Sequence, residues 1–301
     1  MKSIPWRTQG GISFRQPTKG SGMGVHGGPL RLGTITDSHV AGIGAADTYF
    51  NNRVHLGLSR ALLTEALSWL TPRVDALLLL GDLTQSATPE EFRFVLDELD
   101  ATELPCFVVP GNHDCPAPTD DGLLAGHLKG RERIRIPGKE PLGPALLTAG
   151  HLTRTAGGEY HNRLENPAPA RLPVLLTHFP VLDLRPAIKD RGWQYAGDLT
   201  NRAELEKQLR AWPEPVLVLH GHLHTRAHAV AGNVLQLGMG ALAEAPHDVA
   251  LVSIDASPRG LRVTRECHQV LEVAPGTRPA VLSPESSSFT FTGRTWLSEV
   301  G

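Results

Sequence analysis

This sequence contains five short apolar runs, and each stops beside side chains that can bind a metal ion. The runs cover residues 30–36, 76–80, 106–109, 173–176 and 215–219. The potential ligands that follow them are Asp37 and His39, Asp82, Asn112 with His113, His178, and His222 with His224. Runs of this length are typical of buried strands. Because ligands of open α/β sheets bind beyond the carboxyl ends of the strands, we expect these side chains to converge on one site.

The segments between the runs predict helices early in the chain and further strands later. Residues 58–70 have helical spacing, residues 88–91 read as a capped helix start, and residues 201–212 predict a helix capped by Asn201. Short strands that pair antiparallel are expected at 233–237, 249–254 and 261–265, with a turn at 255–260. This order of elements favours a mixed α/β sandwich.

The composition divides the chain into one domain with flanking segments. Residues 1–29 carry several basic side chains and many glycines, so we expect a tail outside the fold. Residues 30–274 form the predicted domain. Within it, residues 115–170 are rich in Pro and Gly and predict an insertion or cap with little regular structure. Residues 275–301 are rich in Pro and Ser and predict a peripheral tail.

The balance of charge and the scarcity of cysteine exclude several kinds of protein. The chain has 29 Lys and Arg against 31 Asp and Glu, which gives no general attraction to nucleic acid or anionic membranes. No apolar run approaches the roughly 20 residues that span a bilayer. Three scattered cysteines indicate neither a disulfide framework nor a cysteine-rich zinc site. We expect a cytoplasmic protein whose partner is a small molecule; the oligomeric state stays open.

The spacing of the potential ligands suits a metal centre built from oxygen and nitrogen. Asp37 and His39, like His222 and His224, lie two residues apart, so in extended backbone both members of each pair project to the same side. Glycines 81, 111 and 221 precede ligands and permit sharp turns. Carboxylate, amide and imidazole groups without a thiolate favour Mn, Fe or Zn.

Taken in order, these blocks resemble the signature of the calcineurin-like metallophosphoesterase superfamily. The resemblance covers residues 30–270 and depends on Asp-x-His, Gly-Asp, Gly-Asn-His-Asp, a lone His and Gly-His-x-His. It implies a four-layer αββα sandwich with two mixed β-sheets. It also implies two divalent metal ions and hydrolysis of a phosphate ester.

The resemblance further implies a role for each residue. Asp37, His39, Asp82 and His224 would bind the first metal ion. Asp82, Asn112, His178 and His222 would bind the second, with Asp82 bridging the two. His113 would face the phosphate and stabilise the transition state or protonate the leaving oxygen. Asp114 would orient His113 or a neighbour.

Residues near Asp82 indicate a branch of the superfamily. No Asp-Arg pair follows the motif, as it does in serine/threonine protein phosphatases, and Gln85 stands where purple acid phosphatases have a tyrosine. The segment 81–91, GDLTQSATPEE, is similar to the cyclic-nucleotide and glycerophosphodiester phosphodiesterases. We therefore expect a binuclear phosphodiesterase with a metal-bridging hydroxide as nucleophile. A phosphomonoesterase, a nucleotidase and a non-catalytic interaction scaffold are the alternatives.

The loop after His39 supplies two candidate substrate contacts. Asn52 and Arg53 follow a ligand-bearing strand end, so either could hold a phosphate oxygen or a base. An ordinary surface loop explains them equally well. His220 is expected to pack at a strand end and not to bind metal.

Overall fold

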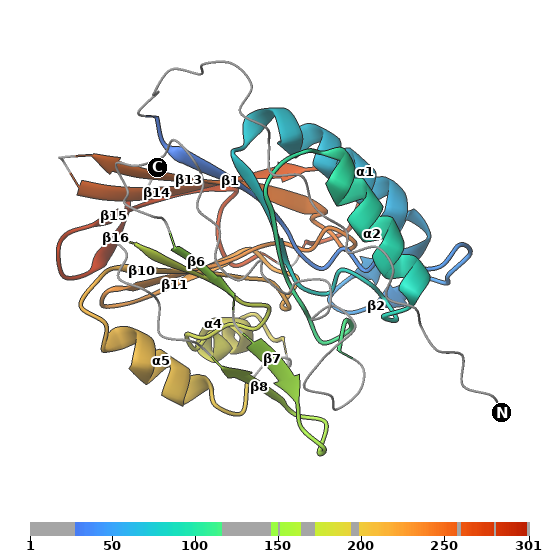
Figure 1. Ribbon diagram of the computed structural model, residues 1–301. Coiled ribbons are helices and arrows are strands. Elements are labelled where there is room, and N and C mark those ends of the chain that lie inside the picture. Colours follow the sequence, from blue (N-terminus) through green and yellow to red (C-terminus); the bar gives the residue numbers. More distant parts are fainter. Residues whose placement is uncertain are drawn as a thin grey trace, which may run out of the picture.

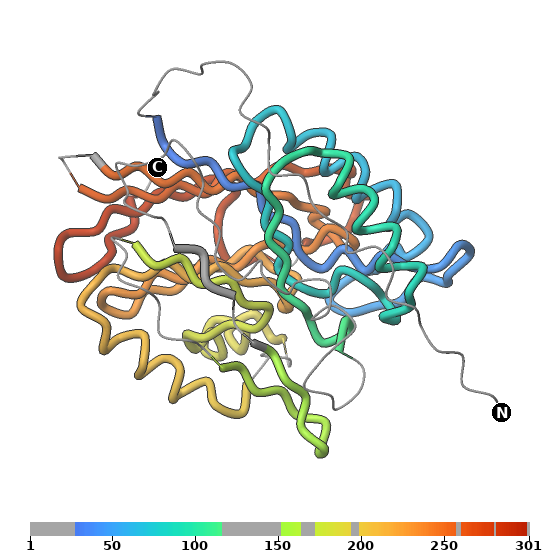
Figure 2. Tube along the Cα trace, in the orientation of Figure 1, coloured from blue at the N-terminus to red at the C-terminus, as the bar shows by residue number. Residues whose placement is uncertain are grey.

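The computed structural model describes residues 28–115, 146–149, 151–163, 172–193, 199–257, 260–279 and 281–299. The predicted tail therefore lies outside the described residues except at 28–29, and so does most of the predicted cap. Two large sheets stack face to face with helices on both outer sides, as Figure 1 shows and the trace in Figure 2 follows.

The larger sheet has seven strands in the order β16-β15-β14-β13-β1-β4-β5. β1 pairs parallel with β4, and β4 pairs parallel with β5, whereas β1 pairs antiparallel with β13. The strands are β1 (Leu30–Ile35), β4 (Ala76–Leu80), β5 (Cys106–Val109), β13 (Asp248–Ser257), β14 (Gly260–Gln269), β15 (Ser286–Phe291) and β16 (Trp296–Glu299). β13 and β14 pair antiparallel as the sequence predicted.

The smaller sheet has five strands in the order β11-β12-β10-β9-β6. They are β6 (Leu146–Ala149), β9 (Pro173–Leu176), β10 (Val216–His220), β11 (Ala227–Ala231) and β12 (Val234–Gly238). β12 was expected to pair antiparallel. It does so with β11 but runs parallel to β10, because the β11–β12 hairpin returns the chain to the sheet in the direction of β10.

Helices complete the four layers. α1 (Ser59–Leu70) and α2 (Pro89–Ala101) pack on the outer face of the larger sheet, and α5 (Arg202–Arg210) packs on that of the smaller one. The short α4 (Arg185–Asp190) contacts the start of β11 through Ile188. The structure is thus the predicted αββα sandwich with two mixed sheets (Figure 1). None of the helices in the described ranges is long and apolar enough to cross a membrane.

The residues of β4 show why the apolar runs form central strands. Leu78 and Leu80 face the core between the sheets, whereas Leu77 and Leu79 face the core beneath α1 and α2. Successive side chains of a strand point to opposite faces, so a strand covered on both sides must be apolar at every position.

The two predicted helix caps have different outcomes. Thr88 accepts a hydrogen bond from the Glu91 amide at 3.3 Å, and the Glu91 carboxylate accepts one from the Thr88 amide at 3.2 Å, so the capping box is confirmed. Asn201 precedes α5 but its side chain does not cap the helix. Its amide instead donates to the Asn162 carbonyl at 2.6 Å and accepts from the Asn162 amide at 3.1 Å. This pairing holds β8 (Tyr160–Arg163) beside α5 and replaces the cap.

Two segments predicted to be irregular contain strands. The described part of 115–170 includes β6, which pairs with β9, and a hairpin of β7 (His151–Arg154) and β8. Its Pro- and Gly-rich surroundings concealed these short strands.

The predicted peripheral tail 275–301 is likewise part of the fold. β15 and β16 form the edge of the larger sheet, and Phe289 and Trp296 are buried in the core between the sheets. The segment SSSFTF places apolar rings on one face and small polar side chains on the other, a pattern that a count of Ser and Pro does not reveal.

Buried charged groups join the two sheets. Arg226, directly before β11, makes two hydrogen bonds to the carboxylate of Asp248 at the start of β13, one of them 2.8 Å long. Arg265 of β14 donates to the carbonyl oxygens of Ala227 and Gly238 in the smaller sheet at 2.8 and 2.9 Å. Each of these three pairings joins the larger sheet to the smaller sheet or to the residue directly before it, so these contacts hold the two sheets in register.

The glycines at the strand ends allow the loops to pack closely. A Cβ on Gly221 would lie 1.8 Å from Oγ1 of Thr36, and a Cβ on Gly111 would lie 2.1 Å from Oδ1 of Asp82. Of the glycines at 81, 111 and 221, Gly81 has a positive φ, of 91°, and its Cβ would also meet the His178 ring. Glycine is therefore required at 81, 111 and 221 because neighbouring atoms lie too close for a Cβ; a positive φ adds to this requirement at Gly81.

The left-handed backbone conformation falls largely on the predicted ligands themselves. The residues concerned are Asp37 (φ 50°), His39 (φ 43°), Asp82 (φ 48°), His222 (φ 68°) and His224 (φ 51°). Non-glycine residues in this region each cost about 1–3 kcal/mol and persist only where the surroundings hold them. Such residues cluster at functional sites, so their positions indicate a functional site at this edge of the sandwich.

We predict that Asp248→Ala lowers the free energy of unfolding by about 3–5 kcal/mol, because it removes the buried carboxylate that pairs with Arg226 and leaves that guanidinium with the exposed Glu285 at 3.4 Å. The matched control is Glu299→Ala, which removes an exposed ion pair with Arg262 and hydrogen bonds from Ser288 and Thr290, and which should cost much less because solvent screens exposed charges. Urea unfolding followed by circular dichroism measures both. Equal losses in the two variants would contradict a structural role for the buried pair.

We predict that Gly221→Ala prevents the strand ends from closing, because its new Cβ would overlap Thr36 and lie 2.7 Å from Oδ2 of Asp37. Metal bound per protein chain should fall sharply by elemental analysis. Gly42→Ala, near the same site but with no atom within 4 Å of the added Cβ, should bind as much metal as the unaltered protein. Full metal content in Gly221→Ala would show that the close approach is dispensable.

Candidate metal centre

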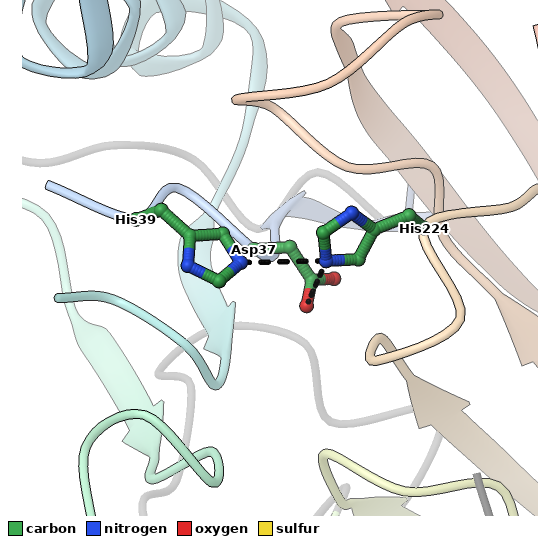
Figure 3. A group of neighbouring side chains, drawn as sticks. All are labelled: Asp37, His39 and His224. Atoms are coloured by element: carbon green, nitrogen blue, oxygen red, sulfur yellow. Dashed lines mark hydrogen bonds and ion pairs between the residues drawn. The ribbon is translucent and has the colours of Figure 1, made fainter. Parts of the chain in front are cut away.

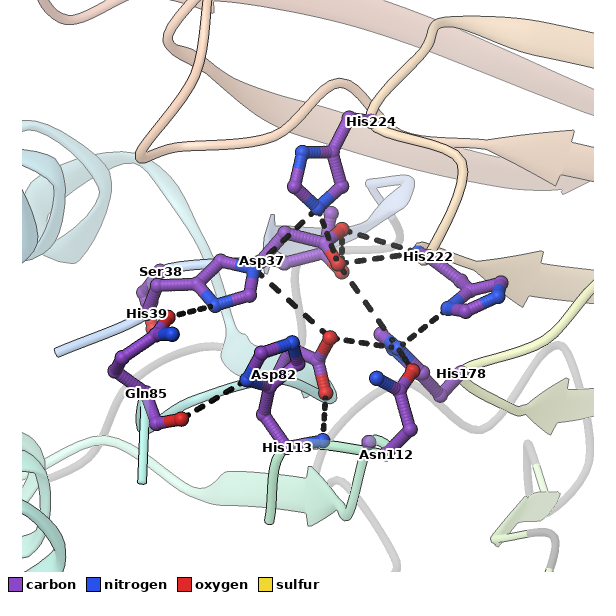
Figure 4. A network of polar contacts seen from close by, with 12 residues as sticks. Asp37, Ser38, His39, Asp82, Gln85, Asn112, His113, His178, His222 and His224 are labelled. Carbon is purple, nitrogen blue, oxygen red and sulfur yellow. Dashed lines mark hydrogen bonds and ion pairs between the residues drawn. The ribbon is translucent and has the colours of Figure 1, made fainter. Parts of the chain in front are cut away.

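The ends of five parallel strands from both sheets meet at one place. β1, β4 and β5 of the larger sheet and β9 and β10 of the smaller sheet each lead directly into the segment that carries the predicted ligands. Figure 4 shows that the structure brings all of them together: Asp37, His39, Asp82, Asn112, His178, His222 and His224. They come from positions as distant in the chain as 37 and 224.

One group of ligating atoms consists of Asp37, His39 and His224 (Figure 3). Nε2 of His224 lies 3.3 Å from Oδ1 of Asp37 and 3.3 Å from Nε2 of His39. The Asp37 carboxylate also accepts hydrogen bonds from Oγ1 of Thr36 at 2.7 Å and from the amide of His222 at 3.1 Å. These bonds fix its orientation.

A second group consists of Asp82, His178 and His222. Nε2 of His178 lies 3.2 Å from Nδ1 of His222 and 3.2 Å from the side-chain oxygen of Asn112. The amide oxygen of Asn112 thus faces the same point as the imidazoles.

Asp82 lies between the two groups. Its Oδ2 is 3.3 Å from Nε2 of His178 and 3.9 Å from Nε2 of His39, which belong to different groups. Its Oδ1 accepts a hydrogen bond from the amide of His113 at 2.7 Å. One carboxylate therefore contacts both halves of the site and the loop after β5.

Outer hydrogen bonds aim three of the imidazoles inward. Nδ1 of His178 donates to the carbonyl oxygen of Leu80 at 2.8 Å, and Nδ1 of His39 donates to Oε1 of Gln85 at 2.9 Å. Nδ1 of His224 is hydrogen-bonded to Oε2 of Glu244. Because Nδ1 is engaged in each ring, Nε2 is the nitrogen that faces the other ligands, the usual arrangement around bound metal ions.

Gln85 and Glu244 both contact candidate ligands; the sequence analysis did not single out Glu244 and noted Gln85 for the tyrosine that is absent there. The carbonyl oxygen of Gln85 also accepts a hydrogen bond from Nδ1 of His113 at 2.9 Å, so one residue orients two histidines. Glu244 is completely buried and accepts a hydrogen bond from the amide of Asn52 as well as contacting His224. Glu244 lies in no recognisable motif. Gln85 lies in the segment 81–91 after β4, but only the folded chain shows which histidines it contacts.

His113 and Asp114 differ in their surroundings. With Nδ1 held by Gln85, the Nε2 side of His113 is directed to the site, and its ring centroid lies 4.7 Å from that of His39. A ring nitrogen of His113 lies close enough to Asp82 and His39 to form a third, overlapping group of possible ligands. Asp114 accepts hydrogen bonds from Leu83, Thr84 and Gly111. It joins the loops after β4 and β5 and shows no hydrogen bond to the His113 ring.

Charge at the site is distributed unevenly. Burial disfavours the charged forms, but neighbouring histidines, above all His224, lower the pKa of Asp37 to about 2. Burial also opposes a charge on His178 and His224, yet Asp82 raises the pKa of His178 to about 9 and Asp37 raises that of His224 to about 10. Burial lowers the pKa of His39 to about 4. The carboxylates of Asp37 and Asp82 thus favour the positively charged forms of His224 and His178.

These features fit metal ions. Two pairs of ring nitrogens face each other at 3.2 and 3.3 Å, and a cation placed among their lone pairs would satisfy both members of each pair. The same cations would replace the protons that the carboxylates hold on His178 and His224. Carboxylate, amide and imidazole donors without a thiolate suit Mn, Fe or Zn.

The remaining candidates lie outside these groups. Arg53 donates to Asp47 at 2.7 Å, and its side chain is largely exposed. The side chain of Asn52 donates to the carbonyl oxygen of Arg278 at 3.4 Å. His220 is fully buried, and its Nδ1 donates to the Gly221 carbonyl at 2.9 Å, in agreement with packing at a strand end.

Similarity to known proteins agrees with this geometry. The chain is 27% identical over 217 residues to a 3',5'-cyclic-nucleotide phosphodiesterase of Nostoc sp., a match that covers 70% of this chain and 77% of that protein. It is 29% identical over 80 residues to a probable glycerophosphodiester phosphodiesterase GpdQ of Arcobacter nitrofigilis, covering 27% of this chain and 28% of that protein.

Among solved structures, the purple acid phosphatase PPD1 from yellow lupin superposes with a TM-score of 0.47 at 12% identity, covering 88% of this chain and 54% of the plant protein. The model of the calcineurin-like phosphoesterase family matches residues 30–226, the stretch that contains every candidate metal ligand. Since that match spans more than half of the sequence, the chain belongs to the calcineurin-like phosphoesterase family.

Proposed function

We propose that this protein is a phosphodiesterase that depends on two divalent metal ions. The observation that carries the proposal is the position of Asp82, whose Oδ2 lies between imidazole nitrogens of two separate ligand groups. A carboxylate shared in this way is the natural bridge between two cations. The complete set of donors favours an enzyme over a non-catalytic interaction scaffold.

Each ligand group would hold one ion. Asp37, His39 and His224 would bind the first, and Asn112, His178 and His222 the second, with Asp82 contributing to both. When bound, two such ions supply a water-derived nucleophile near neutral pH and neutralise the phosphoryl oxygens. Mn, Fe and Zn all fit the donor set.

His113 would protonate the leaving oxygen or stabilise the charge that develops on the phosphate. The Gln85 carbonyl holds its Nδ1, so proton exchange would take place at Nε2. Asp114 would be a positioning residue. Its carboxylate accepts hydrogen bonds from the amides of Gly111 and Leu83, and these bonds hold the loop that bears His113 against the end of β4. The resemblance implied that Asp114 orients His113 or a neighbour, and these bonds support the second of these roles.

A diester is the favoured substrate because both relatives with named activities are phosphodiesterases, one for cyclic nucleotides and one for glycerophosphodiesters. A phosphomonoesterase or nucleotidase on the same site remains the alternative outcome of an assay. A cytoplasmic location and a small-molecule partner, with no stable nucleic-acid or membrane partner, stay predictions from the sequence.

We predict that metal-stripped protein regains hydrolysis of bis-(p-nitrophenyl) phosphate when Mn²⁺, Fe²⁺ or Zn²⁺ is added back. Release of p-nitrophenol from this diester and from p-nitrophenyl phosphate is followed by absorbance. A higher kcat/KM for the diester supports a phosphodiesterase, and a higher value for the monoester supports the alternative. No cleavage of either, with both metal ions bound, would defeat the enzymatic proposal.

We predict that His113→Ala retains two metal ions per chain but loses about 100- to 10,000-fold in kcat, because it removes the proton donor. The loss should be greater for alkyl than for p-nitrophenyl leaving groups, which need protonation less. Asp82→Asn, the contrasting variant, should lose metal as well as turnover. If His113→Ala also loses metal by elemental analysis, His113 is a ligand and the assigned role is wrong.

A further inference from the structure

Arg265 of β14 is a completely buried cation without a carboxylate partner. Its side chain has no exposed surface, and it forms no ion pair within the described ranges of the chain. The buried carboxylate of Asp248 makes its hydrogen bonds with Arg226 instead. Burial lowers the pKa of Arg265, and the positive charge of Arg226 acts in the same direction. Because a buried charge is costly unless an opposite charge accompanies it, an anion at this position would stabilise the fold.

One donor of the Arg265 guanidinium has no partner. Nη1 donates to the carbonyl oxygens of Ala227 and Gly238, and Nη2 donates to Oγ of Ser283 at 2.6 Å and to the carbonyl oxygen of Pro284 at 3.2 Å. Nε is buried and has no hydrogen-bond partner among the described residues. Since buried donors in proteins are nearly always satisfied, Nε indicates an acceptor that these residues do not supply.

Two further buried polar atoms without a partner lie beside Arg265. Ser287 of β15 stands directly opposite Arg265 in the pairing of β14 with β15, so both side chains project from the same face of the sheet. His228 of β11 follows Ala227, whose carbonyl oxygen Arg265 binds. Oγ of Ser287 and Nδ1 of His228 are buried and, like Nε of Arg265, lack a hydrogen-bond partner in the part of the chain that the structure describes.

His228 faces the same space between the sheets as the other two side chains. Its ring centroid lies 5.1 Å from that of Phe289, which is buried in the core between the sheets. Phe289 is two residues from Ser287 on β15, so the two side chains point to the same face. After burial, Arg265 is the cause that lowers the pKa of His228, which agrees with their proximity. The three residues therefore form one cluster, the Arg265 cluster.

The Arg265 cluster extends from the core toward the edge of the sandwich. Arg265 is 0% exposed, Ser287 is 9% exposed, and His228 is half-buried on β11, the edge strand of the smaller sheet. An ion from solvent would thus have to cross only this edge to reach the guanidinium.

We propose that Arg265, His228 and Ser287 form a binding site for a small monovalent anion of the halide type, such as chloride. Nε of Arg265 supplies charge and a hydrogen bond, the Ser287 hydroxyl donates a second, and Nδ1 of His228 donates a third when it carries the ring proton. A single water molecule accepts two hydrogen bonds and offsets no charge, so it would satisfy the cluster less well. The site is separate from the metal centre, and the proposal does not depend on the proposed function.

The first test measures whether a halide stabilises the protein. Thermal unfolding of the full-length protein is followed by circular dichroism in sodium chloride and in sodium gluconate of the same ionic strength, because gluconate is too large for such a site. A ligand that binds only the folded state raises Tm in proportion to its occupancy. We expect chloride to raise Tm by about 3–8 °C and to reach saturation.

Variants then assign the effect to the cluster. Ser287→Ala and His228→Phe each remove one donor, and phenylalanine keeps a ring beside Phe289. Ser286→Ala is the matched control, because it makes the same change at the adjacent, exposed position. The Kd of chloride, taken from the Tm titrations, should rise about 10- to 100-fold in both cluster variants and less than about 2-fold in Ser286→Ala. In gluconate, Ser287→Ala should keep the Tm of the unaltered protein, since its hydroxyl has no partner to lose.

Crystals soaked in sodium bromide give an independent readout, because bromide is located by its anomalous scattering. We expect a peak within hydrogen-bond distance of Nε of Arg265. A water molecule there without anomalous signal would overturn the proposal. So would a rise in Tm that is absent in chloride, or one that both cluster variants retain, since the halide would then bind elsewhere. Neither readout requires hydrolysis, so these outcomes leave the proposed function untouched.

Discussion

The burial of two carboxylates, Asp37 and Asp82, where the two sheets meet is the constraint on which the rest of this structure depends. A buried ionised group is stable only if it is paired and hydrogen-bonded. Here the pairing comes from the other sheet: His178 and His224, which follow strands of the smaller sheet, lie 3.3 Å from oxygens of Asp82 and Asp37, which follow strands of the larger one. The sheets must therefore be held at one relative position. The buried Arg226–Asp248 pair and Arg265 provide that restraint, because each joins an element of one sheet to the other.

Local strain follows from the same crowding. Five candidate ligands have left-handed backbone conformations, and glycine is required where a Cβ would overlap Thr36, Asp82 or His178. These conformations are unfavourable in isolation, so packing elsewhere must stabilise them. The unbroken apolar strands β4 and β10 supply this stability, since each is buried on both faces directly before its ligand.

The sequence allowed the sandwich and the ligand set to be predicted because both depend on local patterns. An apolar run of strand length followed by Asp, Asn or His can be recognised without knowing the fold, as the agreement of β4 and β5 with their predicted bounds illustrates. The contacts of Gln85 and Glu244 could not be predicted, because they involve distant partners: Glu244 contacts His224, 20 positions away, and Asn52, 192 positions away. β15 and β16 were not predicted, because the Pro- and Ser-rich composition of residues 275–301 was taken as the signal and the alternation of apolar and polar residues in SSSFTF was not.

Arg53 and Asn52 stay candidate substrate contacts, with an ordinary surface loop as the equal alternative. The fold pairs the Arg53 side chain with Asp47, and Phe50 of the same hairpin, formed by β2 (Thr48–Tyr49) and β3 (Arg53–Val54), contacts the ring of His224. The β7–β8 hairpin makes a comparable contact, because the Tyr160 hydroxyl donates to the Asn112 carbonyl at 3.4 Å. Both hairpins thus lie against residues of the candidate metal centre, whose side chains are held in place by the charges that they must bury.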